Sequence, residues 1–246
     1  MIVAYFFISL IAFFYASIGF GGATGYLAVM SVFGVEPKIM ASAALTLNIF
    51  VAGISFVTYF RAGHLRRDLL IPFIITSIPA AFIGGSFKLD DETYSILLYS
   101  ALTFVALRLL FFSKKRTELE PLHPVPFWLA LVIGCVIGLL SGMVGVGGGI
   151  FLSPIILYAR WGNAKQAATV AAAFIVLNSA SGFFGRLAAG TLIFDSFSLS
   201  LLPFAILGGL AGSWLGAQRI GNLNLRRTLG VVTSFAVTNF WWALLK

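Results

Sequence analysis

Long apolar runs with almost no charge most constrain what this chain can fold into. They cover about residues 2–18, 23–35, 39–59, 69–87, 94–112, 127–141, 150–159, 166–185, 196–217 and 228–245. Most are near the ~20 residues that a helix needs to cross a bilayer. Of the 246 residues, 60% are hydrophobic and 10% are charged, whereas a soluble domain has about 25% charged residues. The sequence therefore predicts an all-α protein that crosses a membrane several times.

The charge and the single cysteine narrow the functional classes. A net charge of +8 would suggest nucleic-acid binding in a soluble protein. Here the basic residues lie mostly in short loops between apolar runs, so membrane topology explains them and no nucleic-acid partner is expected. Cys135 is the only cysteine, so an internal disulfide is excluded, and its apolar run predicts that it is buried. No catalytic constellation, metal-ligand spacing or nucleotide motif is recognisable, so we expect neither an enzyme nor a cofactor.

Two dense glycine runs interrupt the apolar sequence, one in each half of the chain. The first contains Gly19, Gly21 and Gly22, and the second contains Gly145, Gly147, Gly148 and Gly149. Glycine has no Cβ, so the backbone can bend sharply there and approach a ligand closely. The second run is too dense for a helix-packing stripe, and we interpret it as a backbone break that lines a site. By contrast, Gly208, Gly212 and Gly216 recur every four residues, which is typical of close helix packing.

The two halves repeat the same order of motifs. Gly19, Gly21 and Gly22 match Gly145, Gly147 and Gly148 at an offset of 126 residues, and Ala41-Ser42 matches Ala168-Thr169 at an offset of 127. The polar stretch 114–126 separates the halves. We therefore predict a first membrane repeat over 1–113, a cytoplasmic linker over 114–126 and a second repeat over 127–246. Each repeat has one glycine-broken stretch and three transmembrane helices.

The distribution of basic residues predicts how the repeats are oriented. If each broken stretch crossed the membrane once, the charges would show almost no bias. If each returns to its own side, eleven basic residues gather on one face: Arg61, Arg66, Arg67, Lys114, Lys115, Arg116, Arg160, Lys165, Arg219, Arg226 and Arg227. The other face keeps four: Lys38, Lys88, Arg186 and Lys246. The positive-inside rule then predicts inverted repeats with both termini outside the cytoplasm. A re-entrant hairpin and two short crossings remain alternatives.

The broken helices predict an anion site. A helix that restarts at membrane depth, near Ala23 and near Ile150, presents unpaired N–H groups and the positive end of its dipole. Such breaks survive only inside protein or beside a cavity. The polar residues of the long segments that follow are further candidates for the site: Ser42, Asn48, Thr169 and Asn178. For the hydroxyls, ordinary bonding to a backbone carbonyl one turn earlier is an equal alternative.

Two arginines flank the loops that follow the long segments. Arg61 precedes Gly63 and Arg186 precedes Gly190. In the inverted arrangement they lie at opposite faces, where each could draw an anion toward the site. A role at the lipid headgroups is the alternative, and we favour it for Arg61.

These residues resemble a known family. The run Gly145-Val146-Gly147-Gly148-Gly149 with Pro154 is similar to the paired glycine signature of the TauE/SafE sulfite exporters. The first run repeats it with Ala23 and Ala28 in place of the third glycine and the proline. The resemblance covers essentially the whole chain. It implies transport of small sulfur-containing or organic anions, such as sulfite or sulfonates, across a prokaryotic inner membrane.

The membrane potential bears on the direction of transport. One charge crossing 100 mV gains about 2.3 kcal/mol, so an inside-negative cell drives anions outward without a coupling ion. No chain of acidic or histidine residues lies within the apolar segments. We therefore expect a secondary exporter of a small anion. The alternatives are a cation-coupled importer and a membrane assembly subunit that transports nothing. The oligomeric state is left open.

Overall fold

The computed structural model describes residues 2–111 and 122–218 of the chain. In this part all regular structure is helical: α1 (Ile2–Ala16), α2 (Ala23–Val32), α3 (Pro37–Arg61), α4 (Arg67–Ser86), α5 (Asp91–Phe111), α6 (Phe127–Val144), α7 (Gly149–Tyr158), α8 (Ala164–Ala188), α9 (Ser196–Ser200) and α10 (Leu202–Gln218). The helices follow the apolar runs because a helix satisfies its backbone groups internally, as lipid requires. The all-α prediction is confirmed. The predicted segment 228–245 and most of the linker lie outside the described residues.

Five described segments are long and apolar enough to cross a membrane: Pro37–Arg61, Arg67–Ser86, Phe127–Val144, Ala164–Ala188 and Ser196–Ala217. The helices α1, α2 and α7 are shorter. They are shorter because each ends or begins at a glycine run, which divides the apolar stretch into two pieces.

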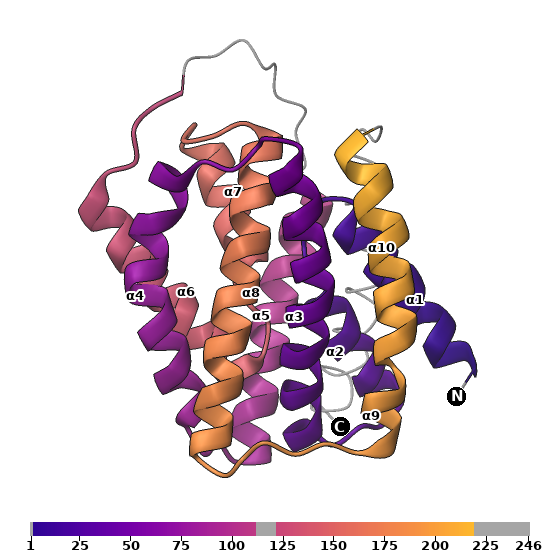
Figure 1. Cartoon of the computed structure of the whole chain (residues 1–246). Coiled ribbons are helices and arrows are strands. Elements are labelled where there is room, and N and C mark those ends of the chain that lie inside the picture. The colour runs from indigo at the N-terminus through magenta and orange to yellow at the C-terminus, as the bar shows by residue number, and fades with distance from the viewer. Residues whose placement is uncertain (1, 112–121, 219–246) are drawn as a thin grey trace.

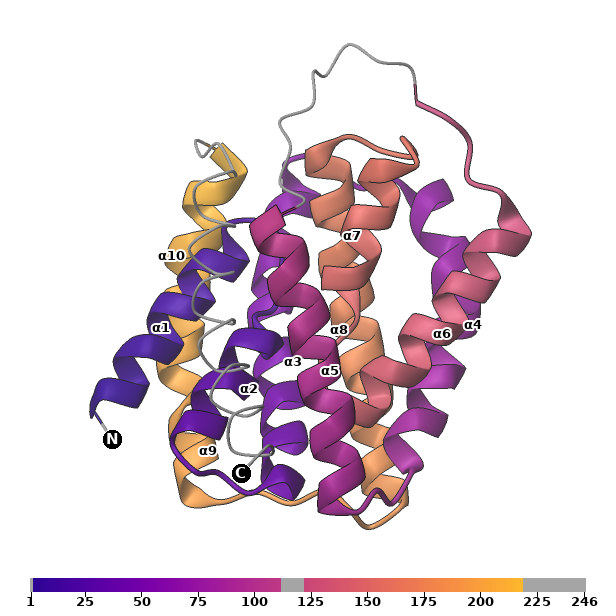
Figure 2. The same cartoon turned by 180° about the vertical axis from the view of Figure 1, so that it is seen from behind.

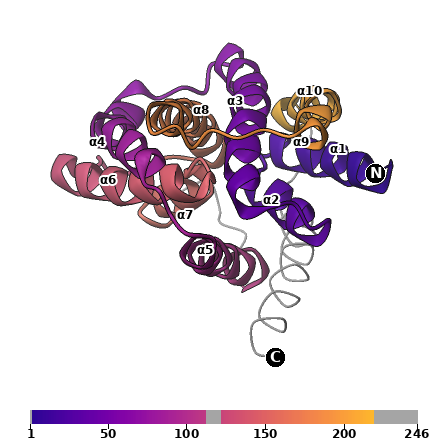
Figure 3. The same ribbon diagram turned by 90° about the horizontal axis from the view of Figure 1, so that it is seen from below.

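The long helices run between two ends of the bundle, called here the upper and lower ends as drawn in Figure 1. The loop between α3 and α4 lies at the upper end, and the loops between α4 and α5 and between α8 and α9 lie at the lower end. From behind, α6 starts near the upper end and α7 returns to it, whereas α2 leads to the lower end (Figure 2). Seen from below, α3 and α8 occupy the middle, between α4 with α6 and α1 with α10 (Figure 3). The first broken stretch therefore packs beside α3 through α2, and the second packs beside α8 through α6 and α7.

Glycines let the flanking helices approach closely. The helix α10 packs along α1, and a Cβ at Gly208, Gly212 or Gly216 would overlap a backbone carbonyl of α1 or of Ser17, which directly follows it. The prediction of a packing stripe is confirmed. On the other side α6 packs along α4, where α6 carries its own stripe of Gly134, Gly138 and Gly142.

The glycine stripe of α6 also explains an error of the sequence analysis. Cys135 is exposed, so the prediction that it is buried was wrong. The face of α6 that packs on α4 carries Gly134 and Gly138. Cys135 instead lies beside the exposed side chains of Val132 and Val136 on the outward face. An apolar run does not distinguish these faces, because lipid accepts apolar side chains as readily as a protein core does.

The two ends differ in charge. The described ionisable residues of the loops and helix ends at the upper end include Arg61, His64, Arg66, Arg67, Asp68, His123, Arg160 and Lys165. At the lower end the loops and helix starts carry Glu36, Lys38, Lys88, Asp90, Asp91, Glu92 and Asp195. Positive charge thus prevails at the upper end and negative charge at the lower one.

Local contacts order the loops at these two ends. Arg66 donates from Nη1 to the carbonyl of Trp161 at 3.0 Å, which joins the two upper loops. At the lower end Lys38 pairs with Asp91 at 3.4 Å. Partial burial and the nearby Lys165 lower the pKa of His64. Hydrogen bonds from Thr93 lower the pKa of Asp90.

Candidate functional site

Each glycine run ends in a left-handed residue immediately before a helix. Gly22 has φ 99° before α2, and Gly148 has φ 78° before α7, and neither helix has a side-chain cap. This conformation is costly for residues with a Cβ, which explains glycine at both positions. The helices restart at Ala23 and Gly149, in agreement with the predicted positions. The N-cap residues of α2 and α7 therefore supply no side chain to the first N–H groups of these helices.

A small cavity lies between the two breaks. Its accessible volume is about 10 Å³, about the space of a single water molecule. It is lined by Tyr15, Phe20, Gly21, Gly22, Ala23, Thr24, Val146, Ile150 and Ile175. The first half supplies the end of α1, the first break and the start of α2. The second half supplies the second break, the start of α7 and one residue of α8. The fold thus brings both glycine runs to one place, although they are more than a hundred residues apart in sequence.

Asn48 of α3 joins the two breaks. Its side chain is fully buried. Its Oδ1 accepts a hydrogen bond from the backbone N–H of Ala23 at 3.1 Å, and its Nδ2 donates to the carbonyl of Val146 at 3.2 Å. One carboxamide therefore satisfies the first N–H of α2 and a carbonyl of the second break.

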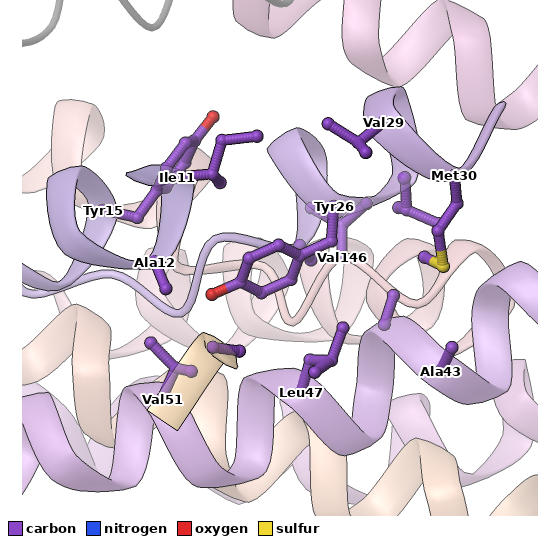
Figure 4. Close-up of a cluster of buried hydrophobic side chains, with 14 of the residues drawn as sticks. Ile11, Ala12, Tyr15, Tyr26, Val29, Met30, Ala43, Leu47, Val51 and Val146 are labelled. Carbon is purple, nitrogen blue, oxygen red and sulfur yellow. The ribbon is translucent and has the colours of Figure 1, made fainter. Parts of the chain in front are cut away.

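Aromatic side chains surround the first break. The hydroxyls of Tyr15 and Thr24 are hydrogen-bonded at 2.6 Å, which connects α1 to the first turn of α2. Figure 4 shows Tyr26 of α2 in the apolar cluster with Val51 of α3. The hydroxyl of Tyr26 is buried and has no hydrogen-bond partner. A Cβ at Gly22 would meet this hydroxyl at 2.7 Å, so the Tyr26 ring closely covers the first break.

The second break has more unpartnered polar groups around it. The hydroxyls of Ser141 and Ser179 and the Oδ1 of Asn178 are buried without a hydrogen-bond partner. A Cβ built at Gly147 would lie 2.9 Å from the hydroxyl of Ser179, and one at Gly148 would lie 3.5 Å from the Cβ of Ser141. Both serines therefore flank the backbone turn that leads into α7. Buried polar atoms without a partner in the protein are uncommon in folded proteins, so this side of the second break is distinct in its polarity.

Other candidates have partners away from the cavity. The hydroxyl of Ser42 accepts from the N–H of Ile193 at 3.2 Å. Thr169 donates to the carbonyl of Lys165 at 2.8 Å, which is the backbone bonding named as the alternative for the hydroxyls. Asn178 donates from Nδ2 to the carbonyl of Phe174 at 2.8 Å. None of these three residues lines the cavity between the breaks.

The outer glycines of the two runs each contact the long helix of the other half. A Cβ at Gly19 would lie 2.7 Å from the Cβ of Ala168, and a Cβ at Gly145 would lie 2.9 Å from the carbonyl oxygen of Ala41. These four residues are the ones that the sequence repeat relates in pairs. The outer glycines therefore pack against helices, whereas Gly21 and Gly22 line the cavity.

The two arginines have different environments. Arg61 is exposed at the upper end of α3, whereas Arg186, in the last turn of α8, is only 6% exposed. Arg186 donates from Nη2 to the carbonyl of Met143 at 2.7 Å, near the end of α6. The hydroxyl of Tyr94 donates to the next carbonyl, that of Val144, at 3.1 Å. Arg186 thus lies beside the second break and not in an open loop.

Sequence reasoning missed several residues near the breaks. Ser141 directly precedes Gly142, so its place at the edge of the glycine run was a usable indication. Tyr59 contacts the first break, where its hydroxyl donates to the carbonyl of Ser17 at 2.8 Å, and nothing in its sequence neighbourhood marks it. Among the described residues, no group of three or more His, Cys, Asp or Glu side chains could hold a metal ion.

Comparison with known proteins identifies the family. Residues 4–240 match the family described as Sulfite exporter TauE/SafE. This chain belongs to the TauE/SafE sulfite exporter family. It is 32% identical over 234 residues to "Probable membrane transporter protein y4hK" of Sinorhizobium fredii (strain NBRC 101917 / NGR234), a match that covers 94% of each chain. It is 28% identical over 213 residues to "Probable membrane transporter protein ORF9" of Sinorhizobium sp, covering 85% of this chain and 77% of that protein.

No solved structure matches the chain. The family and both relatives support a membrane transporter as the general class of this TauE/SafE protein. Together with the candidate spans, they support a multi-pass membrane protein that handles a small-molecule substrate.

Proposed function

We propose that this TauE/SafE protein is a secondary exporter of small sulfur-containing or organic anions, such as sulfite or sulfonates. The observation that carries the proposal is the cavity between two glycine breaks. Beside this cavity, the N-cap residues of α2 and α7 are Gly22 and Gly148, which have no side chain of their own to cap the helix. Uncapped helix starts present N–H donors and partial positive charge, which favour an anion. The family name points to the same chemical class.

In this proposal the anion is bound by backbone N–H groups of the breaks. The glycines that form them are Gly19, Gly21, Gly22, Gly145, Gly147, Gly148 and Gly149. The contact between Asn48 Oδ1 and the N–H of Ala23 supports this assignment, since a carboxamide oxygen there takes the place that an anion oxygen would take. In this proposal Asn48 lies at the site, and an oxygen of the substrate replaces its Oδ1 as the acceptor for the N–H of Ala23.

The remaining candidate residues, in this proposal, line the route by which the anion reaches and leaves the cavity. Asn178 is one residue from Ser179, whose unpartnered hydroxyl faces the second break. Ser42 and Thr169 follow Ala41 and Ala168, which contact the outer glycines. Arg61 and Arg186 stand toward opposite ends of the bundle, where they attract the anion from either side.

The proposal includes inverted repeats over 1–113 and 127–246, joined by a cytoplasmic linker over 114–126. Three observations support it: the opposite courses of the two broken stretches, the packing of α1 on α10 and of α6 on α4, and the reciprocal contacts of Gly19 and Gly145. The basic upper end then faces the cytoplasm of a prokaryotic inner membrane, and the N-terminus faces outward. The C-terminus lies outside the described residues.

Flux into proteoliposomes under an imposed potential tests the transport function. The panel is sulfite, thiosulfate, sulfoacetate and acetate, with empty liposomes as the control. We expect flux of at least one sulfur-containing anion, driven toward the positive side without a proton or sodium gradient. Flux that requires an inward cation gradient would instead make the protein an importer. Absence of flux for the whole panel would favour an assembly subunit without transport.

Topology has a separate test. Reporter fusions are placed after Ser113, in the linker, and at Asp90, at the lower end. The inverted arrangement predicts a cytoplasmic reporter at Ser113 and an external one at Asp90. A cytoplasmic reporter at Asp90 contradicts it.

A further inference from the structure

Arg186 is a buried cation without a carboxylate partner. Arg186 is only 6% exposed. Its Nη2 donates to the carbonyl of Met143, and its Nε is buried with no hydrogen-bond partner. The ion pairs among the described residues are Lys38–Asp91 and Arg66–Asp68, and neither includes it. Cations at membrane depth without a counter-charge are costly and are mostly found where they have a function.

The contact to α6 compensates only part of this charge. Arg186 and Tyr94 donate to the carbonyls of Met143 and Val144, which lie at the C-terminal end of α6. A helix C-terminus carries roughly half a negative charge. The guanidinium therefore keeps positive charge, and its Nε–H has no partner in the protein.

The first half shows that this position does not require a charge. Tyr59 of α3 donates to the carbonyl of Ser17 at the first break, just as Arg186 donates to that of Met143 at the second. Ser17 and Met143 are 126 residues apart, and Tyr59 and Arg186 are 127 apart. The same offsets relate Gly19 to Gly145 and Ala41 to Ala168. A neutral hydroxyl thus suffices to hold the end of the first helix, so capping alone does not explain an arginine in the second half.

We infer that Arg186 is a second anion-binding station, separate from the cavity between the glycine breaks. Arg186 is absent from the lining of that cavity, and it belongs to the last turn of α8, toward the lower end of the bundle. Its free Nε and its charge pair with a sulfonate, sulfite or carboxylate group that passes between the cavity and the lower end. A guanidinium suits this role because its fixed N–H groups match the oxygens of such anions. The inference rests on the proposed transport of an anion.

The fold itself supplies the test variant. Arg186→Tyr copies the solution of the first half, since a tyrosine hydroxyl can donate to Met143 without carrying a charge. Arg186→Lys keeps the charge and a donor. Each is purified, checked for its unfolding midpoint in detergent and assayed in proteoliposomes for KM and maximal flux, using the panel anion with the highest wild-type flux. Tyr59→Phe is the matched control, because it removes the corresponding hydrogen bond at the first break without changing any charge.

We expect Arg186→Tyr to fold and to raise KM by roughly tenfold or more, because a hydrogen bond between charged partners is lost. Arg186→Lys should stay within about threefold of the wild type, since it keeps the charge. Tyr59→Phe should lower the unfolding midpoint and leave KM unchanged. A folded Arg186→Tyr variant with the wild-type KM overturns the inference and makes Arg186 a structural cap.

Two further outcomes keep the test decisive. If Arg186→Tyr is not recovered in folded form, Arg186→Gln is used in its place, because its amide can donate to Met143 without charge, and the same criteria apply. If the wild type moves no anion of the panel, the proposed function fails and this inference fails with it. If the wild type transports an anion and the uncharged variant has the same KM, the role of Arg186 in anion binding is refuted and the proposed transport function stands.

Discussion

The two glycine breaks share a backbone design but differ in side-chain chemistry. Each has a left-handed glycine before a helix, Gly22 and Gly148. In each, a side chain of the long helix, Tyr59 of α3 or Arg186 of α8, donates to a backbone carbonyl at the end of the preceding helix. At the first break most polar groups are paired internally: Asn48 binds the N–H of Ala23, and Tyr15 binds Thr24. Among the described buried side chains at this break, the hydroxyl of Tyr26 has no hydrogen-bond partner.

The second break has the opposite character. The residues around it include unpartnered groups of Ser141, Asn178, Ser179 and Arg186. The residue that stands 127 positions after Asn48 is Ile175, and Ile175 lines the cavity but cannot make the bonds that Asn48 makes. The comparison shows that two copies of one backbone design can keep the same shape while their polar side chains are hydrogen-bonded differently. In the first copy most polar side chains bond within the protein, and in the second copy several have no partner in the protein.

The largest effect is expected at the glycine before α7. In Gly148→Val the new Cβ would lie 2.6 Å from Cγ2 of Ile137 and 2.9 Å from Cε1 of Phe174, at φ 78°. The left-handed conformation alone costs about 1–2 kcal/mol for a residue with a Cβ. Anion flux should fall by tenfold or more while the protein still inserts, as measured in proteoliposomes and by membrane yield.

The control for this variant is Gly53→Ala. Nothing lies within 4 Å of a Cβ at Gly53, so flux should be unchanged. Wild-type flux in Gly148→Val would mean that the second break does not need its glycine-only conformation, and the comparison between the breaks would lose its basis.

The next largest effect is expected at Asn48. Asn48→Leu leaves the N–H of Ala23 and the carbonyl of Val146 without their partner, and each buried group left unpaired costs about 1–3 kcal/mol. The midpoint of denaturant-induced unfolding in detergent, followed by tryptophan fluorescence, should therefore fall clearly. Ile175→Leu is the matched control and should cost less than about 1.5 kcal/mol, since it conserves volume. Equal losses in both variants would show that Asn48 is not the link between the breaks.

A smaller effect is expected from the unpartnered serines. Ser179→Ala should leave the unfolding midpoint unchanged or slightly higher, because its hydroxyl has no partner to lose. If that hydroxyl binds the anion, KM should rise by roughly threefold to tenfold. Ser55→Ala is the control, because its hydroxyl bonds to the carbonyl of Val51 at 3.0 Å, and it should affect stability and not KM. An unchanged KM in Ser179→Ala would remove Ser179 from the ligand site.

The smallest effect concerns pH and the upper end. Burial and Lys165 lower the pKa of His64 below its usual value of 6.5, so the folded protein binds this proton less readily than the unfolded chain. The stability that neutral His64 contributes is complete above pH 6.5 and is lost as the pH falls toward its folded pKa. In His64→Gln the unfolding midpoint should depend less on pH between about 6.5 and 5.

This last measurement tests whether the pH dependence of stability comes from the upper loops or from the breaks. Residues 17–22 and 145–148 contain no Asp, Glu or His. If the pH dependence between these values persists unchanged in His64→Gln, a group outside the upper loop must be responsible, and the breaks would need to be examined again.

The sequence predicted the helical membrane class, the positions of the breaks and the packing stripe of α10. These features depend on properties that are local in the chain. Hydropathy over twenty residues indicates a span, and dense glycines mark where a helix stops and restarts. The same locality explains the failure at Cys135, because an apolar run does not specify which face of a helix is covered by protein.

The partners of the polar side chains depended on the tertiary structure. In sequence, Arg186 seemed to correspond to Arg61, since both precede a loop glycine, but in the fold it occupies the position that Tyr59 has in the first half. Ser42 and Asn48 looked alike as buried polar residues of one segment, yet one bonds to Ile193 and the other joins both breaks. The amino-acid sequence by itself determined that two broken helices exist. Only the packing of helices from both halves decided which break is satisfied by its own protein and which is left with donors, because a hydrogen bond depends on where its partner lies in space.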